Sequence, residues 1–212
     1  MKTTSGISKA ILSGLIALTT LVAGFTDGTS WAGRFDGATT VTSTVTTPLS
    51  SSEAEMLTFM REEEKLARDV YIAMYQKWGA VTFSNIASSE QQHMDTLKKM
   101  LDKYKLPDPA QEALGVFTNS NLQIKYDELL ASGSQSLVNA LYVGATIEEI
   151  DIVDIQHAID VTTHLDLDNA YLSLLEGSKN HLRAYVKALG SQGATYAPQF
   201  ITQELYDAII GL

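Results

Sequence analysis

Carboxylate and imidazole side chains recur along the chain at spacings that suit metal binding. Glu90 and His93 are three residues apart, as are Glu148 and Asp151, and residues three apart share one face of a helix. The other candidates of the same kind are Glu64 and His181. Oxygen and imidazole ligands suit iron, manganese or zinc. The chain has no cysteine, which excludes thiolate zinc sites, iron–sulfur clusters and cysteine nucleophiles.

Each of these residues interrupts the apolar stripe of a predicted helix. The stripes, in which apolar residues alternate at spacings of three and four, predict long helices over 52–78, 82–104, 134–163 and 166–189, and shorter ones over 122–131 and 201–210. Ser52 and Glu55 form a predicted capping box for the first helix. The sequence therefore predicts an all-α fold, a ferritin-like four-helix bundle with a long middle connection and a short C-terminal helix.

Metal binding explains why charged residues stand in these stripes. Burying several carboxylates without a partner costs many kcal/mol or forces the carboxylates to take up protons. Two divalent cations would balance about four carboxylates, and imidazoles would complete the coordination. A single glutamate in a stripe is also typical of a rim residue or of half an ion pair. The hypothesis of a metal site rests on four predicted helices that each place a ligand-type residue near the middle of a stripe.

Other charged residues near these stripes have different expected positions. Glu63 lies close to the inner face of the first predicted helix, and Glu149 flanks Glu148, so both are additional ligand candidates. Three neighbours of Glu63 are expected to point outward: Arg61, Glu62 and Lys65. His164 falls in the turn before the fourth long helix and is expected to be solvated.

The N-terminal part of the chain is typical of an exported protein. Lys2 and Lys9 precede a short apolar run, which predicts a signal peptide over 1–32 that is cleaved after Ala32, with a cut near Gly24 as the other option. The alternative is an uncleaved N-terminal segment that tethers the protein to a membrane. A Thr- and Ser-rich linker is predicted over 33–52 and the helical domain over 53–212. The expected location is extracellular or in the cell envelope.

The charge of the chain limits its partners. The formal net charge is −10 and the calculated pI is about 4.8, so a nucleic-acid partner is not expected. Metal ions and small oxidants are the expected partners, with homo-oligomer formation as a further expectation. The apolar third helix, 134–163, is the segment expected to pack against the last helix or against another copy of the chain.

Several segments resemble a known family. Residues 63–71 resemble the first helix of rubrerythrin-type ferritin-like proteins, with the pattern Glu-x-x-Ala-Arg-x-x-Tyr, and residues 89–93 resemble their second-helix Glu-x-x-His. From about Leu57 to the C-terminus the chain is more closely similar to DUF2202, a prokaryotic ferritin-like family of undefined function. The segments that carry this similarity are 62–71, 88–94, 143–152 and 177–185.

The resemblance to rubrerythrin implies how the candidate ligands are shared between two metal positions. It implies that Glu64, Glu90 and His93 belong to one position. The residues that it assigns to the other are Glu148, Asp151 and His181.

The chain departs from this pattern at one ligand. Where rubrerythrin-type proteins have a glutamate three residues before the second histidine, this chain has Ser178. A bridging carboxylate is therefore missing unless Glu63 or Glu149 replaces it. One iron ion, or an unequal pair, is the alternative to a symmetric di-iron centre.

Two functions follow as expectations. One is an iron-dependent oxidoreductase of the ferroxidase or peroxidase type, in which Fe(II) reacts with dioxygen or hydrogen peroxide. The other is a non-catalytic exported module that binds metal or has a structural role. The sequence assigns no catalytic residue beyond the candidate ligands.

Overall fold

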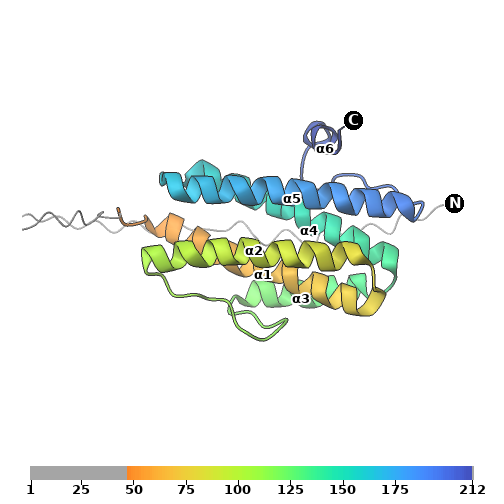
Figure 1. The fold of residues 1–212 in the computed structure, drawn as a ribbon, viewed down its shortest axis with the longest axis horizontal. Helices are drawn as coiled ribbons and strands as arrows, with labels where there is room; N and C mark the ends of the chain where they lie inside the picture. The colour runs from red at the N-terminus through yellow and green to blue at the C-terminus, as the bar shows by residue number, and fades with distance from the viewer. Residues whose placement is uncertain (1–46, 212) are drawn as a thin grey trace, which may run out of the picture. The chain divides into compact units, whose positions relative to one another are not determined.

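The computed structural model describes residues 47–211, which contain six α-helices and no β-strand (Figure 1). The prediction of an all-α fold is confirmed. The predicted signal peptide and most of the predicted linker lie outside the described residues. No helix in the described part of the chain combines the length and apolar character of a membrane span.

Four long helices pack around one core, and two shorter helices cover it. The helices are α1 (Ser51–Trp78), α2 (Val81–Tyr104), α3 (Ser120–Gly133), α4 (Leu137–Val161), α5 (Leu165–Ser191) and α6 (Gln203–Ile210). α1 lies beside α2, and α4 lies beside α5 (Figure 1). The two pairs meet where α1 packs against α4 and where α2 packs against α5. α3 packs against α1 and α4, whereas α6 contacts α5.

The first helix begins two residues earlier than its predicted capping box implies. Ser50 is the N-cap, and its backbone N–H donates to the Glu53 carboxylate at 2.9 Å while its hydroxyl accepts from the backbone N–H of Glu53 at 3.3 Å. Ser52 and Glu55 are exposed, so the predicted box is wrong. Glu53 is the glutamate of the capping box because its other carboxylate oxygen, Oε1, has partners in another part of the fold.

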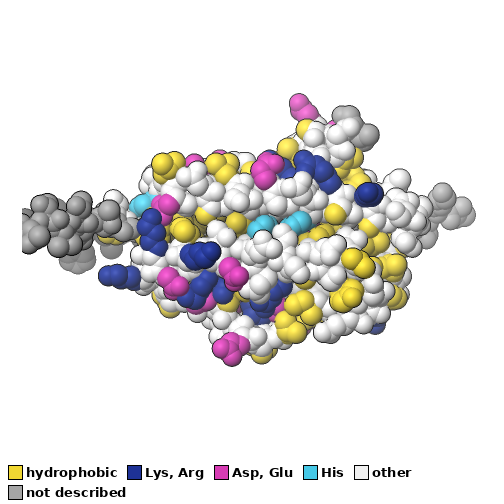
Figure 2. All heavy atoms as spheres, viewed as in Figure 1, with side chains coloured by type: hydrophobic (Ala, Val, Ile, Leu, Met, Phe, Trp, Pro, Cys, Tyr) yellow, Lys and Arg dark blue, Asp and Glu magenta, His cyan; other side chains and the backbone are white. Residues whose placement is uncertain are grey.

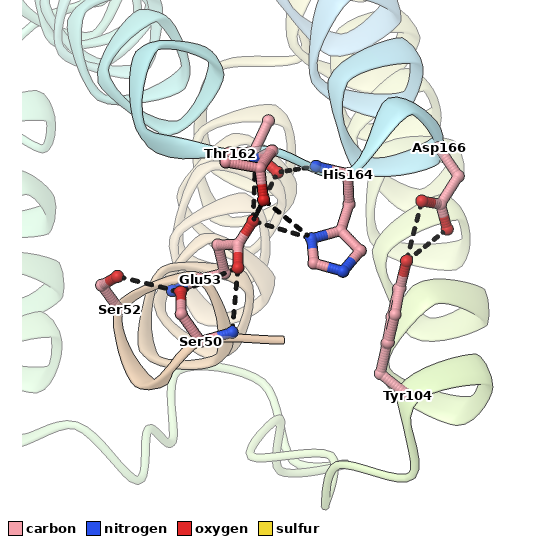
Figure 3. A network of polar contacts seen from close by, with 8 residues as sticks. Ser50, Ser52, Glu53, Tyr104, Thr162, His164 and Asp166 are labelled. Carbon is pink, nitrogen blue, oxygen red and sulfur yellow. Dashed lines mark hydrogen bonds and ion pairs between the residues drawn. The ribbon is translucent and has the colours of Figure 1, made fainter. Parts of the chain in front are cut away.

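Those partners lie in the turn between α4 and α5 (Figure 3). Glu53 Oε1 accepts a hydrogen bond from the Thr163 backbone N–H at 2.8 Å and lies 2.8 Å from His164 Nδ1. Burial alone would raise the pKa of Glu53, but these hydrogen bonds outweigh it and hold the pKa well below its ordinary value. The His164 side chain is only 13% exposed, so the expectation of a solvated histidine is wrong.

The connection between α2 and α3 folds over α1 and buries charged residues on its outer side. Glu62 accepts hydrogen bonds from the backbone N–H groups of Thr118 at 2.6 Å and Asn119 at 3.0 Å. Arg61 forms a two-pronged ion pair with Asp108, at 3.1 and 3.0 Å. Arg61 and Glu62 therefore lie on the outer side of α1, as predicted, but this connection buries them.

Lys65 is the most deeply buried of these residues, with no exposed surface. Its ammonium group pairs with Asp69, donates to the Ala113 carbonyl at 2.9 Å and lies 4.6 Å from the centre of the Phe117 ring. Asp69 also accepts from the Gly115 backbone N–H at 2.9 Å. Lys65 lies on the outer side of α1, as predicted, but it is buried because this connection brings a second set of partners to that side.

Candidate metal centre

Two groups of buried ligand-type side chains lie among the four long helices. Glu64, Glu90 and His93 form one group, and Glu90, Glu148 and His181 form the other. In each group the ligand atoms all lie within 4.8 Å of one another, and these are the two such groups in the described part of the chain. α1 contributes Glu64, α2 contributes Glu90 and His93, α4 contributes Glu148, and α5 contributes His181. We call these five residues the candidate metal centre.

Glu90 lies between the two histidines. Its Oε2 is 2.8 Å from His93 Nδ1, and its Oε1 is 2.9 Å from His181 Nδ1. Each histidine also faces a carboxylate of its own group. His93 Nδ1 is 3.2 Å from Glu64 Oε2, and His181 Nδ1 is 3.4 Å from Glu148 Oε2. Both imidazoles therefore turn the same nitrogen toward the carboxylates, and the two rings stack with their centres 5.5 Å apart.

Burial and the contacts with the histidines together shift the pKa values of the carboxylates apart. Burial is the largest influence on Glu64 and Glu148, and it raises the pKa of each to about 7. Burial would raise the pKa of Glu90 too, but its hydrogen-bond contacts with His181 and His93 outweigh that effect and lower its pKa to about 2. Glu90 is therefore the carboxylate of the centre that stays ionised over the widest pH range.

The pKa values of the two histidines are both raised. Burial alone would lower their pKa values, but the neighbouring carboxylates outweigh it. Glu64 and Glu90 raise the pKa of His93 to about 11, and Glu148 and Glu90 raise the pKa of His181 to about 10. Without a metal ion, two imidazolium groups would therefore supply the positive charge that the carboxylates require.

The hydrogen bonding inside the centre is incomplete. Glu64 Oε1 is buried and has no hydrogen-bond partner. Both carboxylate oxygens of Glu90 and His181 Nδ1 are also buried, and they have ion-pair contacts but no hydrogen bond of normal geometry. A buried polar atom without a partner costs about 1–3 kcal/mol. A cation at this position would satisfy these atoms together. The donor set of three carboxylates and two imidazoles therefore fits a divalent ion of the iron, manganese or zinc type.

Neighbouring residues hold the ligands in place. The Tyr71 hydroxyl donates to Glu148 Oε1 at 2.6 Å, and His181 Nε2 lies 2.9 Å from Ser89 Oγ. A Cβ atom on Gly177 would lie only 2.5 Å from His93 Nε2, so the absence of a side chain there makes room for the imidazole. Contacts of this kind orient metal ligands in many proteins.

Ser89 and Gly177 are two residues of the site that the sequence did not predict. The available signal was Gly177 itself, since a glycine inside a predicted helix often marks a close approach of another group. Figure 2 shows histidine atoms, in cyan, at the surface between α2 and α5. His93 and His181 are only 9% and 8% exposed.

The remaining predicted ligands lie outside the two groups. The Ser178 hydroxyl donates to Asp151 and to the Leu174 carbonyl. Ser178, which stands where the rubrerythrin pattern has a glutamate, therefore holds the Asp151 carboxylate in place. Glu63 is buried and shares a side-chain hydrogen bond with Asp154.

Glu149 lies apart from the centre. Its Oε2 accepts hydrogen bonds from the backbone N–H groups of Gln199 and Phe200, both at 2.7 Å. Its carboxylate therefore links α4 to the segment between α5 and α6 through hydrogen bonds.

Residues 53–211 match the family described as "Uncharacterized protein domain (DUF2202)". The chain belongs to this family. The curated relatives include the uncharacterized protein MJ0754 of Methanocaldococcus jannaschii, which is 48% identical over 164 residues, covering 77% of this chain and 89% of that protein. A solved structure described as the crystal structure of hypothetical protein MJ0754 from Methanococcus jannaschii matches with a TM-score of 0.77 and 47% identity. The match covers 79% of this chain and 96% of that one.

Proposed function

We propose that this DUF2202 protein binds two iron ions at the candidate metal centre and is a ferritin-like oxidoreductase. The observation that carries the proposal is the convergence of buried ligand atoms from α1, α2, α4 and α5 in two adjacent groups that share Glu90. The resemblance of residues 63–71 and 89–93 to rubrerythrin-type helices supports the ferritin-like assignment.

Iron held by carboxylate and imidazole ligands would supply redox chemistry with dioxygen or hydrogen peroxide. The chain's own residues would bind the ions and orient the ligands. Glu90 would help to hold the ion of either group, since one of its oxygens faces each histidine. Tyr71 would hold Glu148 through its hydrogen bond, and Ser89 would fix His181 through Nε2.

Because both groups contain Glu90, substituting this residue tests iron binding at both. The purified protein would be freed of metal, titrated anaerobically with Fe(II), and its iron content and optical spectrum measured before and after adding air or peroxide. We expect the wild type to bind about two iron ions per chain. The Glu90→Ala, His93→Ala double variant should bind neither, because Glu90 is a member of both groups. His157→Ala is the matched control, since His157 is exposed on α4. Equal iron binding by the wild type and the double variant would sink the proposal.

The location of the protein is a separate part of the proposal. The charged and apolar N-terminal residues support export to the cell envelope or beyond, with either cleavage or a retained tether. N-terminal sequencing of the protein from a native extract would decide between the two, and recovery of full-length chain in the cytoplasmic fraction would contradict export.

A further inference from the structure

Two buried tyrosines lie next to the candidate metal centre, and neither is a ligand candidate. Tyr71 belongs to α1 and Tyr185 to α5, and neither residue has any exposed surface. Their rings are in contact, with centres 5.3 Å apart. The ring of Phe83, on α2, packs against both, with its centre 6.4 Å from that of Tyr71 and 5.7 Å from that of Tyr185. Three helices therefore enclose the two phenol groups away from water.

The Tyr71 hydroxyl is hydrogen-bonded to a carboxylate of the centre. It donates to Glu148 Oε1 at 2.6 Å, which is close enough for a proton to be transferred between the two oxygens. The other oxygen, Glu148 Oε2, lies 3.4 Å from His181 Nδ1 and so faces the remaining ligand atoms of its group. The carboxylate therefore has one oxygen for an ion, Oε2, and a different one for the proton of Tyr71, Oε1.

Packing accounts for the ring of Tyr185 but not for its hydroxyl. The hydroxyl is buried and makes no hydrogen bond of normal geometry, although it interacts with the Tyr71 side chain. A buried polar group without a good partner costs about 1–3 kcal/mol, and a phenylalanine would fill the same space without that cost. Gly144, on α4, makes room for the ring, because a Cβ atom there would collide with Tyr185 Cε1. The fold therefore accommodates a second phenol beside Tyr71 whose hydroxyl does not stabilise it.

We propose that Tyr71 and Tyr185 form an electron relay, which supplies one electron to the candidate metal centre when the bound iron cannot give both of the electrons that hydrogen peroxide takes up. The order of the relay follows from the contacts, because Tyr71 is bonded to Glu148 and Tyr185 packs against Tyr71. The relay rests on the proposed function, since iron and peroxide are what oxidise it.

The electrons and protons balance with one Fe(II) and one hydrogen peroxide. Peroxide takes up two electrons and two protons and becomes two water molecules, while Fe(II) gives one electron and becomes Fe(III). Tyr71 gives the second electron, and its phenolic proton passes to Glu148 Oε1 and on to the product water. Solvent supplies the other proton. Tyr71 is left as a neutral phenoxyl radical, which takes a hydrogen atom from the Tyr185 hydroxyl and so regains its own O–H.

The radical is held more favourably on Tyr185 than on Tyr71. Loss of the Tyr185 hydroxyl hydrogen breaks no hydrogen bond of normal geometry, whereas a radical on Tyr71 gives up the bond to Glu148. A neutral radical also adds no charge to the buried site, so it carries no desolvation cost. Because the Tyr185 side chain has no exposed surface, dissolved reductants do not contact it. The oxidised relay should therefore persist long enough to be trapped by freezing.

Electron paramagnetic resonance of frozen samples tests the relay without measuring turnover. Protein loaded with one equivalent of Fe(II) would be mixed with one equivalent of hydrogen peroxide in the absence of air and frozen at successive times. Ring-deuterated tyrosine would identify the radical as a tyrosyl. We expect a tyrosyl radical in the wild type, its loss in Tyr71→Phe and its faster decay in Tyr185→Phe. Tyr75→Phe is the matched control and should keep the signal, because Tyr75 lies one turn further along α1 and is 42% exposed.

Iron content and ferric absorption of the same samples separate this proposal from the proposed function. If the wild type binds and oxidises iron without forming a tyrosyl radical, the relay fails and the proposed function stands. If the wild type binds no iron, both fail. With two equivalents of Fe(II) the iron supplies both electrons, so the radical should be lost, and its persistence there or in the Tyr71→Phe, Tyr185→Phe double variant would overturn the relay. Tyr185→Phe, which removes only an unpaired hydroxyl, decides the test if Tyr71→Phe does not fold.

Discussion

Removing metal ions should leave a protein whose stability decreases as the pH rises. In the metal-free protein, burial raises the pKa of Glu64 and Glu148 from 4.5 to about 7. The neighbouring carboxylates outweigh burial and raise the pKa of His93 and His181 from 6.5 to about 11 and about 10. All four groups therefore bind protons more strongly in the folded state than in the unfolded state.

The sign follows from proton linkage. Stability rises with pH only where the unfolded state binds more protons, and here the folded state binds more. The glutamates lose their contribution as the pH rises from about 4.5 through about 7, and the histidines lose theirs from about 6.5 through about 10 or 11. Glu90 has the opposite shift, to about 2, but its contribution changes only below about pH 4.5.

The expected magnitude is large for a small domain. Each proton held in excess by the folded state changes the free energy of unfolding by about 1.4 kcal/mol per pH unit. Because the four groups interact, we count one proton in excess across the range. That gives a loss of about 4 kcal/mol between about pH 6 and about pH 9. Domains of this size have total stabilities of about 5–15 kcal/mol, so the change is readily measured.

Bound metal should reverse this trend. A metal ion requires deprotonated carboxylates and neutral imidazoles, so its affinity rises with pH. At a fixed excess of Mn²⁺, the added stability should be smallest near about pH 6 and largest near about pH 9. At 100 times the dissociation constant, one bound ion adds about 2.7 kcal/mol.

Urea denaturation followed by circular dichroism at several pH values would measure both trends. Glu176→Gln is the control, because the Glu176 side chain is 64% exposed and should leave the slope unchanged. A metal-free protein whose stability is level or increases between about pH 6 and about pH 9 would refute the buried cluster as described. So would an Mn²⁺ increment that does not depend on pH.

Two substitutions test contacts around the centre and on the outer side of α1. Gly177→Ala should weaken metal binding, because the new Cβ would lie 2.5 Å from His93 Nε2, whereas Gly190→Ala meets no atom within 4 Å and should bind metal normally. Equal metal affinity of the two variants by calorimetric titration would contradict this. Asp69→Asn should lower the free energy of unfolding by about 3–5 kcal/mol, because it leaves the buried Lys65 ammonium without its carboxylate. A loss under about 1 kcal/mol in urea denaturation would be inconsistent with the buried pair.

The residues of the candidate metal centre were predictable because they stand in periodic stripes. A helix repeats its faces every three to four residues, so a charged residue in line with apolar ones is visible in the sequence. Glu64, Glu90 and His93 were identified in this way, and the structure brings them together. The same periodicity predicted the long helices, with ends within a few residues of the observed ones.

The errors share one physical cause, which is that a partner from a distant segment changes the environment of a residue. Lys65 and Glu62 point away from the stripe of α1, as predicted, yet the connection between α2 and α3 covers them. His164 follows a helix end, where solvation is the usual expectation, yet Glu53 from the start of α1 reaches it. Periodicity reports the direction of a side chain, but it carries no information about which irregular segment covers the opposite side.

The structure gives a different interpretation of Ser178, which stands where the rubrerythrin pattern has a glutamate. By comparison with the rubrerythrin pattern, a serine at this position implies a centre that is poor in carboxylate on one side. In the structure the two groups are nearly equivalent, since each histidine faces Glu90 and one carboxylate of its own group, Glu64 or Glu148. The serine hydroxyl instead donates to Asp151. The substitution therefore leaves the five-residue centre balanced, and its effect is on Asp151, which the serine holds outside the two groups.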